Sequence, residues 1–229
     1  GAAANDAFWI SLLPRHVHFY LSELPLANWR VTIEFPQFRH VARLVSSIVD
    51  AKSHFTASHS LGVAQLSRHL GERMGLHPDA LLQVEVAGLM HDVGKLCVPD
   101  EIVDKPASLT PVEFSVMERH SFETYQILRH IPGMETVAEW AAFHHETLNG
   151  RGYPFRLKAE RLSLEARIVA VADVFQALAQ ARPYRGPQPT EVIPRILDLF
   201  VANGALDPEV VAVAGEDLQA SWLAATQTL

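Results

Sequence analysis

Cysteine is almost absent from this chain of 229 residues, because Cys97 stands alone. An internal disulfide is therefore excluded, and a reducing cytoplasm is the expected compartment. No apolar run reaches the roughly 18 residues of a membrane span, and the N-terminus lacks the basic and apolar regions of a signal peptide. The sequence thus predicts a protein with no membrane insertion.

Positive charge is also scarce, with 19 Lys and Arg residues against 26 Asp and Glu residues and a formal net charge of −7. No block of basic residues offsets this balance, so we expect no binding to nucleic-acid polymers. A small anionic ligand would need local positive charge, which bound metal ions can supply.

Strand patterns are rare, whereas helical patterns are frequent. Residues 31–35 alternate once between apolar and polar positions and then meet Pro36. Val63, Leu66 and Leu70 recur at helical spacing, and residues 164–181 form a long apolar segment. The sequence therefore predicts an all-α protein.

Two helix starts are marked clearly. Thr110-Pro111-Val112-Glu113 combines a capping box with proline at the first helical position. Asp207-Pro208 repeats the cap and the proline.

The chain divides into an N-terminal segment and one main domain. Residues 1–37 are interpreted as a helical segment or linker, either a dimerising element that follows another domain or a helix packed on the main body. Residues 38–229 are long enough to bury one hydrophobic core.

Two groups of neighbouring polar residues carry the chemistry. His91-Asp92 is followed by Gly94 and Lys95, and His144-His145 is followed by the glycine-rich run 149–154. Imidazole nitrogen suits iron or manganese, and a carboxylate can bridge two ions. This combination indicates a metal-dependent hydrolase.

Adjacent ligands pose a geometric problem on a helix. His91 and Asp92 would diverge by about 100°, which favours His91 on one ion and Asp92 bridging two. Lys95 would lie one turn away, beside the same site or as a solvated lysine near a helix end. His144 and His145 can both reach one ion only if the helix ends or distorts there; otherwise one of them supports the site indirectly.

Three further candidates come from helical spacing. His59 is in register with an apolar face, where a hydrogen-bonded core histidine is the alternative. Asp173 lies on a small apolar face, and a buried carboxylate there is costly unless a cation balances it. His120 is a candidate ligand or a surface histidine.

These residues resemble the HD-GYP family, a branch of the HD metal-dependent phosphohydrolases. The resemblance spans roughly residues 38–214 and rests on motifs in the family's order and approximate spacing: His91-Asp92-Val93-Gly94-Lys95, Leu109-Thr110, His120, His144-His145-Glu146, Asn149-Gly150-Arg151-Gly152-Tyr153-Pro154 and Arg182-Pro183-Tyr184-Arg185. It implies a helical HD-domain bundle with a metal site in its core and a loop that contains the Gly-Tyr-Pro motif.

The resemblance also implies a function. Members hydrolyse cyclic di-GMP to pGpG, and in some cases to GMP, in bacterial signalling. Two divalent ions are expected, iron or manganese by preference, with nickel or zinc as alternatives in a purified sample. The implied metal ligands are His59, His91, Asp92, His120, His144, His145 and Asp173.

The ligands would divide between the two ions. Asp92 would bridge, with His59, His91 and Asp173 on one ion and the remaining three histidines on the other. Lys95, Tyr153, Arg182 and Arg185 match positions that face the substrate phosphates. Asp92 and Lys95 would be catalytic, because two ions about 3.5 to 4 Å apart activate a water and Lys95 would stabilise the charge on the phosphoryl oxygens.

Two positions depart from the family pattern. Phe55 occupies the place of a glutamate that holds a third metal in some members, so two ions are favoured. Asn149 replaces the usual aspartate, which weakens an argument for partner binding through the loop. Expected partners are cyclic di-GMP, a diguanylate cyclase or another signalling domain, and a second copy of the chain. The alternatives are hydrolysis of another cyclic dinucleotide or nucleotide, and a non-catalytic signalling module.

Overall fold

The structure is a computed structural model that describes residues 32–52, 58–180 and 186–226. Within these ranges every regular element is a helix, and the sole β-type pairing is an isolated bridge between Asn149 and Lys158. The all-α prediction is confirmed. The prediction for the N-terminal segment falls mainly on residues 1–31, and Phe55, Arg182 and Arg185 likewise lie outside the described residues.

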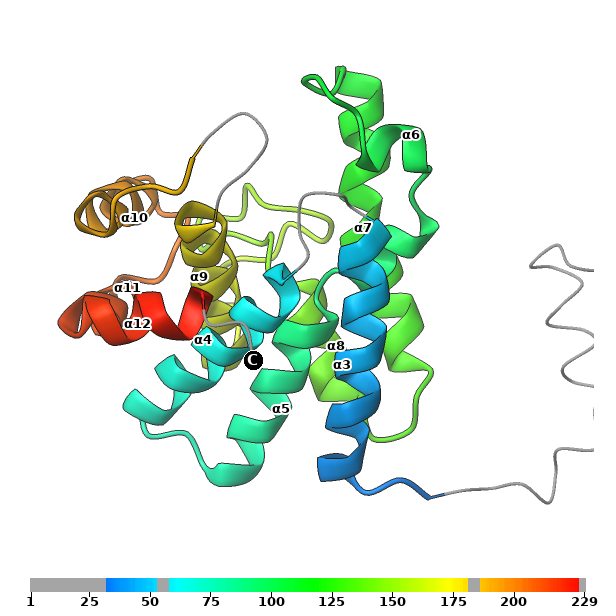
Figure 1. The fold of residues 1–229 in the computed structure, drawn as a ribbon, viewed down its shortest axis with the longest axis horizontal. Helices are drawn as coiled ribbons and strands as arrows, with labels where there is room; N and C mark the ends of the chain where they lie inside the picture. Colours follow the sequence, from blue (N-terminus) through cyan, green and yellow to red (C-terminus); the bar gives the residue numbers. More distant parts are fainter. Residues whose placement is uncertain (1–31, 53–57, 181–185, 227–229) are drawn as a thin grey trace, which may run out of the picture. The chain divides into compact units, whose positions relative to one another are not determined.

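Most of the helices follow one another with short connections, whereas a long segment, residues 143–163, joins α8 to α9 (Figure 1). The α-helices are α3 (Phe35–Lys52), α4 (His59–Arg73), α5 (Pro78–Met90), α6 (Asp100–Val103), α7 (Pro111–Arg129), α8 (Glu135–Ala142), α9 (Leu164–Ala179), α10 (Ile193–Ala202), α11 (Pro208–Glu216) and α12 (Leu218–Thr226). Three short 3-10 helices are η3 (Val93–Cys97), η4 (Ala159–Arg161) and η5 (Thr190–Val192). None of these described helices combines the length and apolarity that crossing a membrane requires.

Both predicted helix starts are confirmed. At α7 the Thr110 hydroxyl accepts the Glu113 N–H, and the Glu113 carboxylate accepts the Thr110 N–H. At α11 the Asp207 carboxylate accepts the N–H groups of Glu209 and Val210. These side chains satisfy donors that a helix cannot satisfy itself.

Helix α9 occupies the centre of the described unit. It packs against α4, α5, α8 and α12, while α7 packs against α8 and η3. Its buried side chains include Ile168, Val169 and Phe175, none of which is exposed. Two polar side chains of α9, Asp173 and Gln176, contact His59 at the start of α4.

Glycine permits one close approach on which the site depends. A Cβ at Gly94 would lie 1.9 Å from the backbone oxygen of His120, so no larger residue fits between η3 and α7. The buried Thr124 hydroxyl joins the same two elements, because it accepts the Gly94 N–H and donates to the carbonyl of His91. The segment that carries Asp92 is thereby held against α7.

Helices end at both paired motifs. Helix α5 ends at Met90, with His91 as its C-cap and Asp92 beyond it. Helix α8 ends at Ala142, so His144 and His145 lie in a turn. The condition for both histidines to face one site is therefore met.

Candidate metal centre

The seven residues predicted to bind metal converge in the core of the described unit. His59 begins α4, His91 caps α5, Asp92 precedes η3, and Asp173 lies on α9. Six of the seven side chains are buried and His145 is half-buried. Within each of three groups, one ligand atom per residue lies within 4.8 Å of the others: His59 with His91 and Asp173; His120 with His144 and His145; and His91 with Asp92 and His144.

Four imidazole rings are oriented by hydrogen bonds on Nδ1. His91, His120 and His144 each place Nδ1 at 2.7–2.8 Å from the carbonyl oxygen three residues earlier. His59 Nδ1 lies 2.5 Å from Oε1 of Gln176. Because these oxygens only accept, each Nδ1 carries the hydrogen and each Nε2 is the atom available to a metal ion.

The Nε2 atoms and the carboxylates meet at short range. Nε2 of His59 lies 3.2 Å from Nε2 of His91 and 3.2 Å from Oδ1 of Asp173. Asp92 directs its two oxygens to different sides, with Oδ2 at 3.2 Å from Nε2 of His91 and Oδ1 at 3.4 Å from Nε2 of His120. This is the orientation that a carboxylate bridging two ions requires.

Electrostatics favour positive charge in the cluster. Burial alone would raise the pKa of Asp92, but the positive charges of His91 and Lys95 hold it well below its ordinary value. Burial alone would lower the pKa of His91, yet the charge of Asp92 and its hydrogen bond raise that pKa to about 9. Burial lowers the pKa of His145 to about 3, which keeps this imidazole in the neutral form that binds metals.

The donor set fits divalent transition metals. Five imidazoles and two carboxylates suit manganese, iron, nickel or zinc, whereas magnesium and calcium prefer oxygen ligands alone. Two of the groups of three match the division that the family resemblance implies, and the third joins His91 and His144 from the two sides through Asp92. The assignment of each ligand to an ion stays a proposal.

Lys95 lies beside this cluster. Its ammonium donates to Oδ2 of Asp92 over 2.6 Å, and its side chain remains 23% exposed. The alternative that Lys95 is a solvated lysine away from the site therefore does not hold. A positive charge at the edge of a metal cluster is suited to a phosphate.

The loop after His145 is held by a buried carboxylate whose role the sequence did not reveal. Glu146 accepts the backbone N–H groups of Phe155 and Leu157 over 2.7 and 2.9 Å. A Cβ at Gly152 would lie 2.4 Å from the backbone oxygen of His145, so the loop folds back on the histidine pair. This places the ring of Tyr153 4.8 Å from that of His145, between the cluster and the surface.

Sequence reasoning also missed Gln176. The spacing of three residues from Asp173 puts it on the same face of α9, and that spacing was the available signal. It is fully buried and holds His59 by the hydrogen bond described above.

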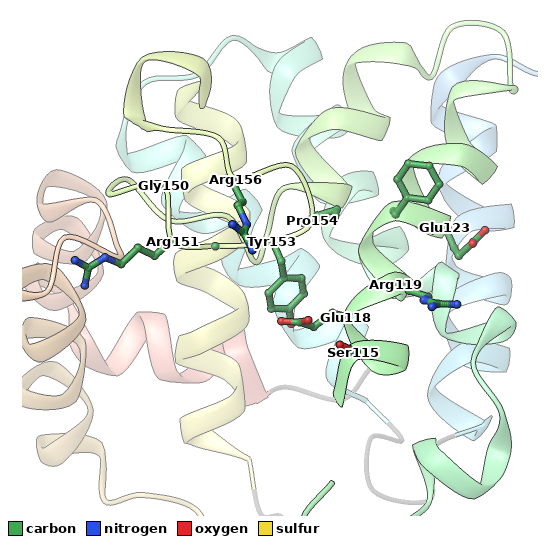
Figure 2. Close-up of a pocket in the computed structure, with 11 residues that line it drawn as sticks. Ser115, Glu118, Arg119, Glu123, Gly150, Arg151, Tyr153, Pro154 and Arg156 are labelled. Atoms are coloured by element: carbon green, nitrogen blue, oxygen red, sulfur yellow. The ribbon is translucent and has the colours of Figure 1, made fainter. Parts of the chain in front are cut away.

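A cavity of about 750 Å³ lies between α7 and this loop (Figure 2). Its lining includes Glu118 and Arg119 from α7, and Arg151, Tyr153 and Arg156 from the loop. Of the four residues predicted to contact substrate, Lys95 and Tyr153 lie at the cluster, while Arg182 and Arg185 fall outside the described residues.

Comparisons with known proteins agree with this geometry. Residues 43–210 match the HD domain family. The chain is 38% identical over 213 residues to 3'3'-cGAMP-specific phosphodiesterase 1 of Vibrio cholerae, covering 92% of this chain and 49% of that protein. It is 35% identical over 173 residues to the cyclic di-GMP phosphodiesterase of Thermotoga maritima, covering 75% of this chain and 46% of that one.

Solved structures share the fold. The HD domain of the L. monocytogenes phosphodiesterase PgpH, in complex with cyclic-di-AMP, superposes with a TM-score of 0.59 at 19% identity, over 81% of this chain and 98% of that one. At this identity the likeness concerns the fold alone. The chain spans about half the length of the curated relatives it matches.

Proposed function

We infer the function of this chain from the family to which it belongs, the HD domain family in its HD-GYP branch. We propose that the chain is a metal-dependent phosphodiesterase. It would hydrolyse cyclic di-GMP to pGpG, with GMP as a further product. The observation that carries this proposal is the convergence of seven candidate ligand side chains, six of them buried and His145 half-buried, on one cluster. A non-catalytic module would have no need of the complete set.

The cluster would hold two divalent ions, iron or manganese by preference. Bound ions of this kind lower the pKa of a water molecule and polarise a phosphate oxygen. The protein's part is to orient the ligands: Asp92 presents one oxygen to each side, and the Nδ1 hydrogen bonds fix the imidazoles. Preorganised ligands lower the cost of reaching the transition state.

Two side chains beside the cluster would act on the substrate. The Lys95 ammonium would stabilise negative charge on the phosphoryl oxygens as the bond to the ribose 3' oxygen breaks. Burial, together with the negative charges of Asp173 and Asp92, raises the pKa of Tyr153, so its hydroxyl stays protonated and able to donate to a phosphate oxygen. Arg182 and Arg185 remain our proposal for binding the second phosphate.

A second candidate substrate has a specific observation in its favour. The relative that matches over 92% of this chain is named for 3'3'-cGAMP, whereas the Thermotoga maritima relative is named for cyclic di-GMP. The two dinucleotides differ in one base, and the metal cluster would act only on the phosphate groups, which are the same in both. The choice between them depends on side chains outside the cluster.

The test is a product analysis. The chain is loaded anaerobically with Mn²⁺ or Fe²⁺ and incubated with cyclic di-GMP, 3'3'-cGAMP and cyclic di-AMP, and the products are separated by chromatography. We expect pGpG from cyclic di-GMP. Asp92→Ala should abolish turnover and deplete bound metal, because it removes the carboxylate shared by both histidine groups.

Two results would reject the proposal. Full turnover by Asp92→Ala with low metal content would reject the assignment of the site. Tight dinucleotide binding by the wild-type chain without turnover at any metal loading would identify a binding module instead.

A further inference from the structure

The cavity between α7 and the loop adjoins the metal cluster through Tyr153. The ring of Tyr153 lies against His145 on one side and lines the cavity on the other. Phe122, further along α7, is half-exposed and lines the same cavity. A volume of about 750 Å³ beside two aromatic rings accommodates a nucleotide base, which can stack on such rings.

Two carboxylates in this cavity, those of Glu118 and Glu123, have no hydrogen-bond or ion-pair partner in the described part of the chain, and Glu118 is the one drawn beside Tyr153 in Figure 2. Glu118 lines the cavity and is half-buried, yet none of the described residues hydrogen-bonds or ion-pairs with its carboxylate. On the same helix Glu113 is engaged by Lys105 and Thr110. A free carboxylate beside a site for a dianionic substrate repels phosphate, whereas it attracts a part of the ligand that donates hydrogen bonds.

The opposite wall supplies donors. Arg156 has a φ of 55°, in the left-handed region that a non-glycine residue rarely adopts. The backbone on both sides of it is held by Glu146, which accepts from Phe155 and Leu157. In Figure 2 its guanidinium runs from the loop towards Tyr153. The cavity thus presents an acceptor from α7 and donors from the loop.

Guanine has the complementary pattern. Its N1–H and N2–H₂ groups are adjacent donors that both oxygens of one carboxylate can accept, and its O6 and N7 are acceptors that an arginine can contact. Adenine places an acceptor, N1, where guanine has a donor. A carboxylate therefore favours guanine over adenine.

We propose that Glu118 is a specificity-determining residue that accepts hydrogen bonds from the Watson–Crick edge of a guanine in the substrate, with Arg156 at the O6 and N7 side. The inference rests on the proposed function and narrows its substrates. Cyclic di-GMP and 3'3'-cGAMP each carry a guanine and are accepted. Cyclic di-AMP carries none and is a poor substrate.

The test uses Glu118→Gln in the full chain loaded with Mn²⁺. Glutamine keeps the size of the side chain, but its amide group offers one acceptor and one donor, which pair with adenine as well. We expect the ratio of kcat/KM for cyclic di-GMP to that for cyclic di-AMP to fall by roughly 5- to 150-fold. Bis(p-nitrophenyl) phosphate, a diester without bases, is the reference substrate for changes that do not involve the base.

Glu123→Gln is the matched control. Glu123 lies five residues further along α7 and lines the same cavity, but Figure 2 shows its carboxylate well apart from Tyr153. This variant removes an equal charge and should leave the guanine to adenine ratio as it is in the wild-type chain.

The outcomes separate this inference from the proposed function. If Glu118→Gln keeps the wild-type ratio, or lowers turnover of cyclic di-GMP, cyclic di-AMP and the reference substrate equally, the inference is wrong while the proposed phosphodiesterase activity stands. If the wild-type chain hydrolyses no dinucleotide, the proposed function fails, and the ratio of Kd values measured by calorimetry then decides whether Glu118 selects guanine. Absence of any dinucleotide binding rejects both.

Discussion

Among single residues, Gln176 connects the hydrophobic core to the candidate metal cluster. It is 1% exposed, accepts from Nδ1 of His59, and donates to Oε1 of Gln180 over 3.1 Å. A ligand whose far nitrogen is held in this way keeps one tautomer and one ring orientation.

Replacing this residue should weaken metal binding. In Gln176→Leu the Nδ1–H of His59 loses its acceptor inside the core, and we expect the affinity for Mn²⁺ to fall by about 10- to 100-fold. Gln176→Glu keeps an acceptor and should retain more of the affinity. Competition with a chelator measures the Kd, and the thermal midpoint of each metal-free variant shows whether the loss is general destabilisation. Equal affinities in all three proteins would show that Gln176 does not orient His59.

Residues of the site differ in how far the sequence could reveal them. The proposed His and Asp ligands follow from the family resemblance, because the order of the family's motifs can be read in the sequence. Gln176 and Glu118 carry no such mark, since a glutamine or a glutamate on a helix is ordinary. Their importance comes from what the fold places opposite them, a ligand ring in one case and an open cavity in the other.

At the scale of helices, the start of α7 depends on a charged capping group. A hydrogen bond from Lys105, then those from the backbone and side chain of Thr110, lower the pKa of Glu113 to about 2 from an ordinary value of 4.5. A depressed folded-state pKa means that the ionised form stabilises the fold. This stabilisation is complete above about pH 4.5 and is lost as the pH falls towards 2.

The comparison of the wild-type chain with Glu113→Gln isolates this effect. Glutamine can still occupy the third position of a capping box but has no charge. We expect the wild-type thermal midpoint to exceed that of the variant above about pH 4.5, with the difference shrinking as the pH falls towards 2. Circular dichroism at a series of pH values measures it. A difference that stays constant from pH 2 to 7 would contradict the assignment.

Helix starts could be predicted from the sequence, whereas the decisive helix ends could not. Capping residues and proline act locally, so the helix starts at Pro111 and Pro208 can be predicted from a few neighbouring residues. The ends of α5 at Met90 and of α8 at Ala142 come before the paired motifs without a glycine or proline to mark them. Tertiary contacts such as that of Gly94 with α7 set the path of the chain there.

For the whole molecule, the partners expected from the sequence are other signalling domains and a second copy of the chain. The relatives are about twice as long as this chain. A diguanylate cyclase or another signalling domain, and a homodimer, remain predictions. Size-exclusion chromatography with light scattering would measure the oligomeric state of the chain directly.

The cluster joins distant parts of the chain, since its proposed ligands come from α4, the end of α5, α7, the turn after α8, and α9. Ions that bind this folded arrangement and not the unfolded chain stabilise it, by about 2.7 kcal/mol when the free ion is at 100 times its Kd. For a chain of this size each kcal/mol raises the thermal midpoint by about 2 to 4 °C. We therefore expect chelation to lower the thermal midpoint by roughly 5 to 11 °C, and we expect the midpoint to rise with the concentration of free Mn²⁺. Asp92→Ala is the control and should show little response to the metal. A wild-type midpoint that does not change between chelator and saturating Mn²⁺ would mean that the seven side chains do not bind the ion in the folded state.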